Sequence, residues 1–411
     1  MEKIPKELKN QDKLLFKLGK KVEILNNLTW PLSTKKKFLK QWKKNNPSLP
    51  EIIYPKYNFS EQKSQLKTIA KNSNLDHPLS HLVKETAKSY VSALEMVEAV
   101  GTKRFFKISG NIYGTPKDPL NKDGVSTIRA AKRFLKSVKK FDLDSISPPE
   151  SACILPETVV DSISKAADYT FGNHNIKILT DGKIKSKASA SPTKIRVRKG
   201  TCFTEHDIQQ LIQHELLVHS LTILNGRKQP LKTLGLNSPR STCAQEGLAV
   251  FAEFITNAID VTRLRRISAR VEAIQIAIDG ADFIDVFKFF LENGQSEEES
   301  FFSAARVFRG GNVRGESVFT KDLVYLKGFI EVHRFFLTAL KHKKFLHPQH
   351  FISGRMCCED VDLLAPFFTS NQLSPPAYQP DWISNRSTLL AFLLSSSVMN
   401  NLGLSKVDSL G

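Results

Sequence analysis

The chain has 411 residues, and its 60 lysines and arginines against 41 acidic residues give a formal net charge of +19. Hydrophobic residues make up 41% and charged residues 25% of the chain, which is ordinary for a globular protein and excludes a wholly disordered, collagen-like or multi-span membrane protein. The five cysteines contain no C-x-x-C pair. The sequence therefore predicts neither a disulfide framework nor a cysteine-based zinc site, and it is consistent with a reducing cytosol.

The first fifty residues are the most basic part of the chain, with 13 lysines and 4 acidic residues. Such a run can form a patch for nucleic acid, an acidic protein surface or anionic lipid. Here the lysines alternate with apolar residues at helical spacing, as at Leu14, Leu15 and Leu18, which favours amphipathic helices packed on a domain. Nucleic-acid binding is therefore not expected. We divide the chain into a basic segment of two or three helices, 1–75, and a larger domain, 76–411.

The next elements are mostly helical, with one β-rich interruption. In chain order the patterns predict a long helix over 77–105, a turn at 110–119, a basic helix over 125–141, a break at 145–150 and a helix over 156–171. Alternating apolar and polar residues over 175–203 then predict two or three strands that include a hairpin. Residues 204–275 and 320–345 are again helical. The fold class is therefore α+β and helix-dominated, with a small sheet just before the most informative helix.

No segment indicates export or a membrane span. The charged N-terminus lacks the apolar region of a signal peptide, which favours a cytoplasmic location, although a signal-independent route of export stays open. The longest uncharged stretch, 387–404, contains serines and asparagines. It is predicted to be a C-terminal core helix and not a membrane-spanning one.

The helix predicted at about 204–224 carries the chemistry. Thr204 and Asp207 have the spacing of an N-terminal capping box, and His214, Glu215 and His219 follow. In the usual zinc motif H-E-x-x-H, the two histidines are i and i+4 and lie about 40° apart around the helix. Here they are i and i+5, about 140° apart in a regular α-helix. They can share a metal only if the helix contains a π-type turn. The alternative is two unrelated helical histidines.

A second helix, predicted at about 243–258, offers a third ligand. Glu246 lies in the sequence Q-E-G-L-A, where Gly247 would allow close helix packing. Histidine, histidine and glutamate together are the donor set of many zinc peptidases. Glu253 is the rival ligand, but it lies two turns further along the same face and cannot bind at the same level. We therefore assign Glu246 as the ligand and Glu253 as a supporting acid.

Three blocks together resemble a known family: H-E-L-L-V-H at 214–219, Q-E-G-L-A at 245–249, and 306–311 with its continuation at 319–328. They resemble the DUF1704, or QEGLA-motif, family, whose bacterial members are labelled flavohaemoglobin expression-modulating proteins. Its animal relatives are the microtubule-associated tyrosine carboxypeptidases. The resemblance implies a zincin-like zinc metallopeptidase of H-E-x-x-x-H type, with one zinc ion bound by His214, His219 and Glu246 and with Glu215 as general base. The tubulin substrate of the animal relatives is not transferred.

The remaining candidates concern the substrate. The strand predicted at 193–198 either pairs with the substrate backbone or is an ordinary sheet strand. Tyr325 either stabilises the oxyanion of the intermediate or is a buried helical residue. Cationic side chains around Gly310 and Gly311 could bind a free carboxylate: Arg306, Arg309, Arg314 and Lys321. Arg306 or Arg309 is the expected anchor.

The expected function is therefore a zinc carboxypeptidase acting on the C-terminus of a peptide or protein, with acidic tails favoured by the basic charge. Two alternatives stay open. One is a regulatory or binding protein with a vestigial metal site, and the other is a zinc hydrolase of a non-peptide substrate.

Overall fold

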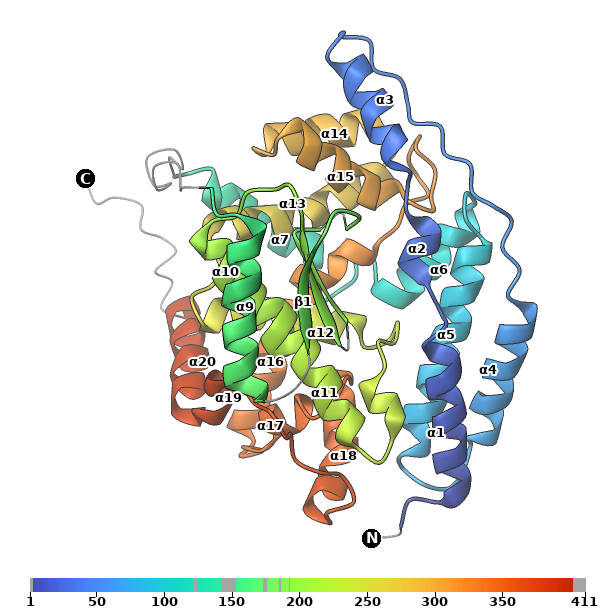
Figure 1. The fold of residues 1–411 in the computed structure, drawn as a ribbon, viewed down its shortest axis with the longest axis vertical. Coiled ribbons are helices and arrows are strands. Elements are labelled where there is room, and N and C mark those ends of the chain that lie inside the picture. The colour runs from blue at the N-terminus through green and yellow to red at the C-terminus, as the bar shows by residue number, and fades with distance from the viewer. Residues whose placement is uncertain are drawn as a thin grey trace.

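The computed structural model describes residues 3–120, 124–141, 153–172, 176–184, 186–191 and 193–401, and it shows helices surrounding one small sheet (Figure 1). The sequence-based expectation of a helix-dominated α+β fold is confirmed. None of the described helices is both long and apolar enough to cross a membrane. The predicted break at 145–150 lies outside the described residues.

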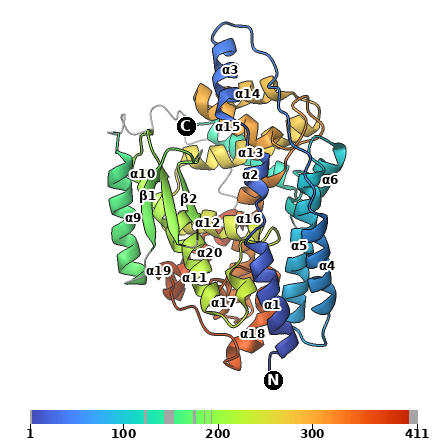
Figure 2. The same ribbon diagram turned by 45° about the vertical axis from the view of Figure 1, so that its right-hand side comes forward.

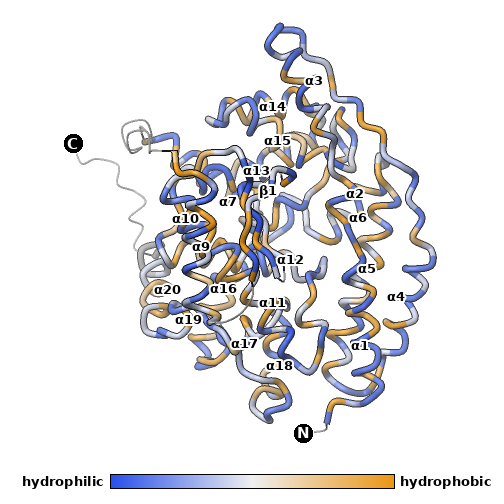
Figure 3. Tube along the Cα trace, viewed as in Figure 1, coloured by the Kyte–Doolittle hydropathy of each residue, from blue (hydrophilic) through white to orange (hydrophobic). Residues whose placement is uncertain are grey.

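The basic N-terminal segment is helical, as its spacing predicts, but its described residues form four helices and not the two or three expected. Its helices are α1 (Lys6–Gly19), α2 (Ile24–Leu28), α3 (Leu32–Trp42) and α4 (Ser60–Asn72). Hydrophilic and hydrophobic residues alternate along α1 and α3 (Figure 3). Buried Leu8 and Leu15 join α1 to the core. The buried carboxylate of Asp12 accepts hydrogen bonds from the backbone N–H groups of Lys232 (2.6 Å) and Thr233 (2.8 Å). The segment therefore packs directly against the rest of the molecule.

The prediction of one long helix over 77–105 is wrong, because two helices occupy this region. They are α5 (Ser80–Glu98) and α6 (Lys103–Tyr113). Gly101 separates them with φ +77°, and its N–H donates to the carbonyl of Gly310 (2.9 Å). Thr102 then caps α6 through the N–H of Phe105. The turn predicted at 110–119 begins later, because α6 continues to Tyr113. A glycine with positive φ and a good N-cap residue explain the break.

The sheet has three strands, and its order decides which strand is exposed. Helices α7 (Thr127–Val138) and α9 (Pro156–Phe171) precede β1 (Lys177–Asp181), β2 (Ala188–Ser191) and β3 (Lys194–Arg198). The order is β1-β3-β2, with β1 parallel and β2 antiparallel to β3. In Figure 2 the sheet lies between α9 on one side and α12 on the other. The predicted hairpin is confirmed as β2–β3, and β2 is an edge strand.

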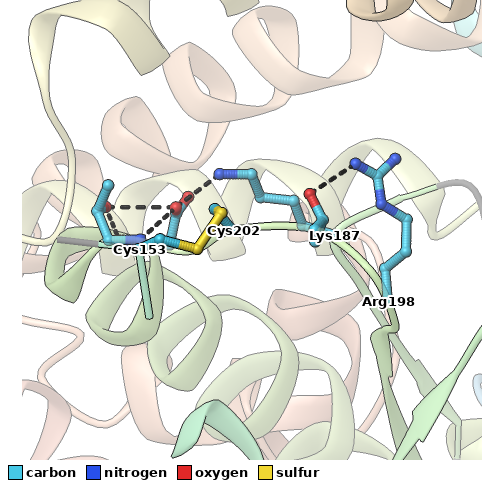
Figure 4. The surroundings of a disulfide bond; sticks show 7 residues. Cys153, Lys187, Arg198 and Cys202 are labelled. Atoms are coloured by element: carbon cyan, nitrogen blue, oxygen red, sulfur yellow. Dashed lines mark hydrogen bonds and ion pairs between the residues drawn. A yellow bond between two sulfur atoms is a disulfide. The ribbon is translucent and has the colours of Figure 1, made fainter. Parts of the chain in front are cut away.

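One disulfide, between Cys153 and Cys202, is present although the sequence predicted no disulfide framework and a reducing environment (Figure 4). The two residues are 49 positions apart, so the bond closes a loop that contains α9 and the whole sheet. Next to it, Ile154 and Phe203 exchange backbone hydrogen bonds of 2.9 and 3.1 Å. The pairing depends on tertiary contact and has no local sequence signature. Because disulfides persist mainly in oxidising compartments, the cysteines no longer support a reducing one.

The C-terminal half of the chain is helical. A continuous helix contains α10 (Glu205–Leu211), η1 (Ile212–Ser220) and α11 (Leu221–Lys228), and η2 (Lys232–Gly235) follows. The later helices are α12 (Thr242–Ile255), α13 (Val261–Ile278), α14 (Phe283–Glu292), α15 (Glu297–Phe308), η3 (Lys321–Leu323), α16 (Val324–Lys341), α17 (His347–Phe351), α18 (Cys358–Thr369), α19 (Asp381–Ser384) and α20 (Arg386–Asn401).

Helix α20 corrects the prediction of a C-terminal core helix. Leu389 and Leu393 are fully buried, whereas Leu390 and Leu394 are 38% and 48% exposed. The helix therefore lies on the surface with one buried stripe. Ser395 is exposed, whereas the partly buried Ser396 forms a hydrogen bond of 2.8 Å with His333 Nε2. Residues 402–404 of the predicted helix lie outside the described residues.

Candidate active site

The helix that carries both histidines is a π-helix over Ile212–Ser220, as the i, i+5 spacing requires. The predicted π-type turn is therefore confirmed. The rings of His214 and His219 lie edge to face with their centroids 4.8 Å apart. The capping box is also present, since the Thr204 hydroxyl accepts from the N–H of Asp207 and the Asp207 carboxylate accepts from the N–H of Thr204. The wider turn brings both rings to the same side of the helix.

Glu246 faces the two histidines from α12. Its Oε2 lies 3.5 Å from His214 Nε2 and 3.6 Å from His219 Nε2. Among the described residues, these three form the one group of three or more whose ligand atoms approach each other closely enough to hold a metal ion, all within 4.8 Å. Their side chains are 6%, 12% and 15% exposed, so the cluster is shielded from bulk solvent.

The position of Glu246 is fixed by the close crossing of α12 and α16, which meet at Gly247 and Gly328. A Cβ added to Gly247 would lie 2.1 Å from the carbonyl carbon of Gly328 on α16. No side chain larger than hydrogen fits there, so α12 and α16 approach through their backbones. The expectation that Gly247 permits close packing is confirmed.

Glu253 supports His214 and is placed outside the cluster, as the spacing of one helix face predicts. Its Oε1 lies 2.6 Å from His214 Nδ1 and accepts from Arg263 Nη2 at 3.0 Å and from Gln210 Nε2 at 3.0 Å. Burial alone would raise the pKa of this carboxyl, but Arg263 and His214 lower it to about 2. Glu253 is therefore ionised and holds the imidazole with Nε2 turned toward Glu246. Carboxylates in this position orient metal-binding histidines.

Glu215 lies between the cluster and the edge of the sheet. Its Oε2 accepts a 2.7 Å hydrogen bond from the backbone N–H of Ala190 in β2. The strand next to the cluster is therefore β2. The predicted substrate-pairing strand, 193–198, corresponds to β3, which is paired on both sides and has no open edge. The alternative reading of β3 as an ordinary sheet strand is the one the structure supports, because the hairpin adds β2 outside it.

Two cavities share His214 and Glu215 in their lining. The metal-cluster lobe, about 540 Å³, contains the three candidate ligands, Glu215, Ser189 and Ala190. The aromatic lobe, about 250 Å³, lies between the α2–α3 connection and helices α13 and α15, with Trp30, Phe301 and Phe302 in its wall. Arg306, Arg309 and Tyr325 line both lobes. The two lobes therefore adjoin each other along these shared side chains.

The shared wall is strongly cationic. Arg306 binds Asp322 with two hydrogen bonds, Nε–Oδ2 at 2.5 Å and Nη2–Oδ1 at 2.8 Å. Arg270 lies 3.7 Å from the same carboxylate. The Nε atoms of Arg270 and Arg309 are buried and have no hydrogen-bond partner among the described residues. Burial lowers the pKa of Arg309 to about 10, so the guanidinium remains charged at neutral pH. Asp322 is therefore the shared counter-ion of this group of arginines. A bound anion could neutralise the positive charge that remains.

The remaining candidates from the sequence are Tyr325, Lys321 and Arg314. Tyr325 lies at the start of α16, with its Oη 3.4 Å from Arg306 Nη2. Lys321 Nζ lies 3.3 Å from Glu246 Oε1. Arg314 is exposed in the loop after Gly311 and does not line either lobe. The structure therefore brings all the candidate site residues together except Arg314.

Sequence reasoning missed Arg263, Arg270 and Arg355. Arg263, Arg266 and Arg270 follow an i, i+3, i+7 spacing, so one helix face carrying them could have been recognised. Arg355 gave no such signal. It reaches the site from the loop before α18, where its Nη2 donates to the carbonyl of His219 (3.3 Å).

Two histidines on a π-helix and a glutamate on α12 form a buried group that could hold a metal ion. This arrangement makes the protein a candidate hydrolase. The family model for microtubule-associated tyrosine carboxypeptidases matches residues 36–401, and the chain belongs to this family. The resemblance seen in the three sequence blocks is thereby confirmed. The family is one of carboxypeptidases, so peptides or proteins are the substrates that membership implies. No curated protein matches the chain.

Proposed function

We propose that this protein is a zinc-dependent carboxypeptidase that removes the C-terminal residue of a peptide or protein. The observation that carries the proposal is the convergence of His214, His219 and Glu246 next to Glu215, in a cavity with a cationic wall. Two imidazoles and one carboxylate are a donor set that suits zinc and leaves a position for water or substrate. A bound zinc ion would supply Lewis acidity, lowering the pKa of a water molecule and polarising a carbonyl group.

Glu215 is positioned for proton transfer. The N–H of Ala190 holds one of its carboxylate oxygens, while its neighbour in sequence, His214, is one of the three candidate metal ligands. In the proposed reaction Glu215 takes a proton from the attacking water and delivers it to the leaving amine. Tyr325 accepts a hydrogen bond from Arg306, so its own O–H proton can be donated into the cavity. There it would stabilise the oxyanion.

Arg309 is the better of the two expected carboxylate anchors. Arg306 already forms a two-point pair with Asp322, whereas Arg309 lines both lobes and forms no ion pair with a described residue. A carboxylate that reaches a guanidinium without a counter-ion gains charge-assisted hydrogen bonds. The free C-terminal carboxylate of a peptide carries this negative charge, whereas an internal peptide bond is neutral. An exopeptidase is therefore favoured over an endopeptidase.

The family's name indicates tyrosine as the residue released, and the aromatic lobe is consistent with a large planar side chain. Aromatic side chains gain most from burial between other rings. We accordingly propose a C-terminal aromatic residue as the preferred substrate group.

The test combines metal content with peptide cleavage. Purified protein should contain about one zinc ion by mass spectrometry, and His214→Ala and His219→Ala should lose it. Glu215→Gln should retain the metal and lose turnover by several orders of magnitude, because it removes the base and leaves the ligands. Full zinc content in a His214/His219/Glu246 triple alanine variant would contradict the assigned ligands.

A second comparison tests the exopeptidase assignment. A peptide acid should be cleaved far better than its C-terminal amide, since the lost interaction is about 1.5–3 kcal/mol for a hydrogen bond to a charged group. Arg309→Gln should remove most of this discrimination, whereas Arg314→Gln, outside the cavity, should not. Equal cleavage of acid and amide by the native enzyme would exclude a carboxypeptidase. A zinc-bearing protein that cleaves no peptide would instead indicate a hydrolase of another substrate.

A further inference from the structure

Part of the aromatic lobe is built by residues that precede the family match. The match begins at residue 36, yet Thr29, Trp30, Pro31, Leu32 and Lys35 all line this lobe. Thr29 also lines the metal-cluster lobe. We call residues 29–35 the wall segment. The cavity next to the candidate catalytic cluster is thus closed by the basic N-terminal part of the chain, whose role the sequence leaves undefined.

The wall segment is held in a defined position. Trp30 donates its indole N–H to Tyr54 Oη (2.7 Å), which also accepts from the N–H of Gly310 (2.6 Å). The Trp30 ring packs against Phe283 and Phe301, with centroid distances of 5.4 and 6.3 Å. These contacts connect the wall segment to the backbone next to Arg309. It is therefore a fixed wall of the cavity.

The start of α3 completes the wall. Pro31 is extended, with φ −61° and ψ 147°, and directs the chain into α3 at Leu32. Lys35 pairs with Glu298 (2.7 Å) and lies 4.9 Å from the ring centre of Phe302. Both views place α3 beside α15 (Figure 1 and Figure 2). Leu32 remains 47% exposed although it lines the lobe, so it offers apolar surface that a ligand could cover.

The charges of the lobe restrict what can enter. Its lining contains eight lysines and arginines but only two carboxylates, Glu215 and Glu299. A basic side chain would meet like charge, whereas an uncharged aromatic one would contact Trp30, Leu32 and Phe302. The lobe begins at His214 and Glu215, where the scissile bond would lie, so its contents would be the last side chain of the substrate.

We propose that the wall segment forms the pocket for the side chain of the released C-terminal residue, with Leu32 setting its size and Lys35 excluding basic residues. This assignment rests on the proposed carboxypeptidase function and adds a specificity-determining element outside the family match.

The experiment uses peptides that differ only in their last residue: tyrosine, alanine, lysine or glutamate. Leu32→Trp should lower kcat/KM for the tyrosine peptide relative to the alanine peptide by at least about tenfold, the scale of steric discrimination in a side-chain pocket. Leu14→Trp is the matched control, since Leu14 is 50% exposed on α1 and lies outside both lobes. Lys35→Glu should raise cleavage of the lysine peptide relative to the glutamate peptide. Lys36→Glu, an exposed neighbour outside the lobe, should leave that ratio unchanged.

A binding measurement separates failure of this proposal from failure of the proposed function. The same substitutions are made in the Glu215→Gln background, and peptide affinity is measured by calorimetry without turnover. The preferences should change in the same direction as in the kinetic assay. If the native enzyme trims peptides but the residue preferences of Leu32→Trp and Lys35→Glu match those of their controls, the wall-segment proposal is overturned and the carboxypeptidase stands. If no peptide is bound or trimmed, both are overturned.

Discussion

Replacing Cys153 and Cys202 with serine removes the covalent link across the loop that contains α9 and the sheet. The link spans 49 sequence positions, for which the chain-entropy model gives about 4 kcal/mol of stabilisation. Both cysteines are exposed, so little packing is lost with the sulfur atoms. We therefore expect the free energy of unfolding of the double serine variant to be about 2–4 kcal/mol lower than that of the oxidised protein.

The assay is urea denaturation of three samples: the oxidised protein, the protein in dithiothreitol and the double serine variant. The reduced protein and the variant should unfold at similar urea concentrations, below that of the oxidised protein, and reductant should not affect the variant. Titration of thiols in denaturant should count three, corresponding to Cys243, Cys357 and Cys358. Five reactive thiols in protein purified without reductant, or identical unfolding of all three samples, would refute the crosslink and the calculation based on it.

Three further predictions concern the site and its supports. Glu253→Gln should weaken zinc binding by about 10- to 100-fold, because His214 loses the carboxylate that orients it. Gly247→Ala should cost more than about 3 kcal/mol, because its Cβ would meet the backbone of Gly328 and not a movable side chain. Stability should fall as the pH drops from about 4.5 toward 2, because the folded state holds the pKa of Glu253 at about 2 and that of Asp322 below its usual range.

Each of these predictions has a matched comparison. Competition with a chelator measures the zinc affinity, and an affinity equal to that of the native protein would contradict the orienting role of Glu253. Gly182→Ala is the control for the helix crossing, since its added Cβ would meet no atom within 4 Å. For the acid transition, melting temperatures of metal-free protein at several pH values are compared with those of Glu253→Gln. The substituted protein should show a shallower decline, and equal slopes would contradict the assignment.

Most of what could be predicted about the candidate ligands follows from the number of residues between them in the sequence. The i, i+5 separation of His214 and His219 is incompatible with shared ligation from an α-helix, so it predicts the π-helix that the structure contains. The two-turn separation of Glu246 and Glu253 likewise predicts that the two carboxylates lie at different levels. These inferences depend only on helix geometry, which acts within a few residues.

The features that sequence reasoning missed depend on contacts between distant segments. The position of β2 outside β3 follows from how the hairpin docks next to Glu215, and no pattern within the strands specifies it. Which arginine is unpaired depends on Asp322, sixteen positions beyond Arg306. Both facts exist only in the folded molecule. The break between α5 and α6 is different, because Gly101 and Thr102 are local signals in the sequence that the prediction of one long helix overlooked.

The π-helix also determines where the protein can lose a residue. In a regular α-helix, a deletion rotates everything that follows by about 100° and shifts it by about 1.5 Å. Within Ile212–Ser220 the wider turn already takes up one additional residue, so deleting one residue between His214 and His219 would give the H-E-x-x-H spacing in an α-helix and keep the later residues in phase. Thr222, which donates to Gln245 Oε1 at 2.9 Å, and Asn225, which donates to the carbonyls of Ile352 and Tyr378 at 2.8 Å, would then keep their neighbours. The same deletion in α11, after Ser220, would turn Asn225 away from its partners.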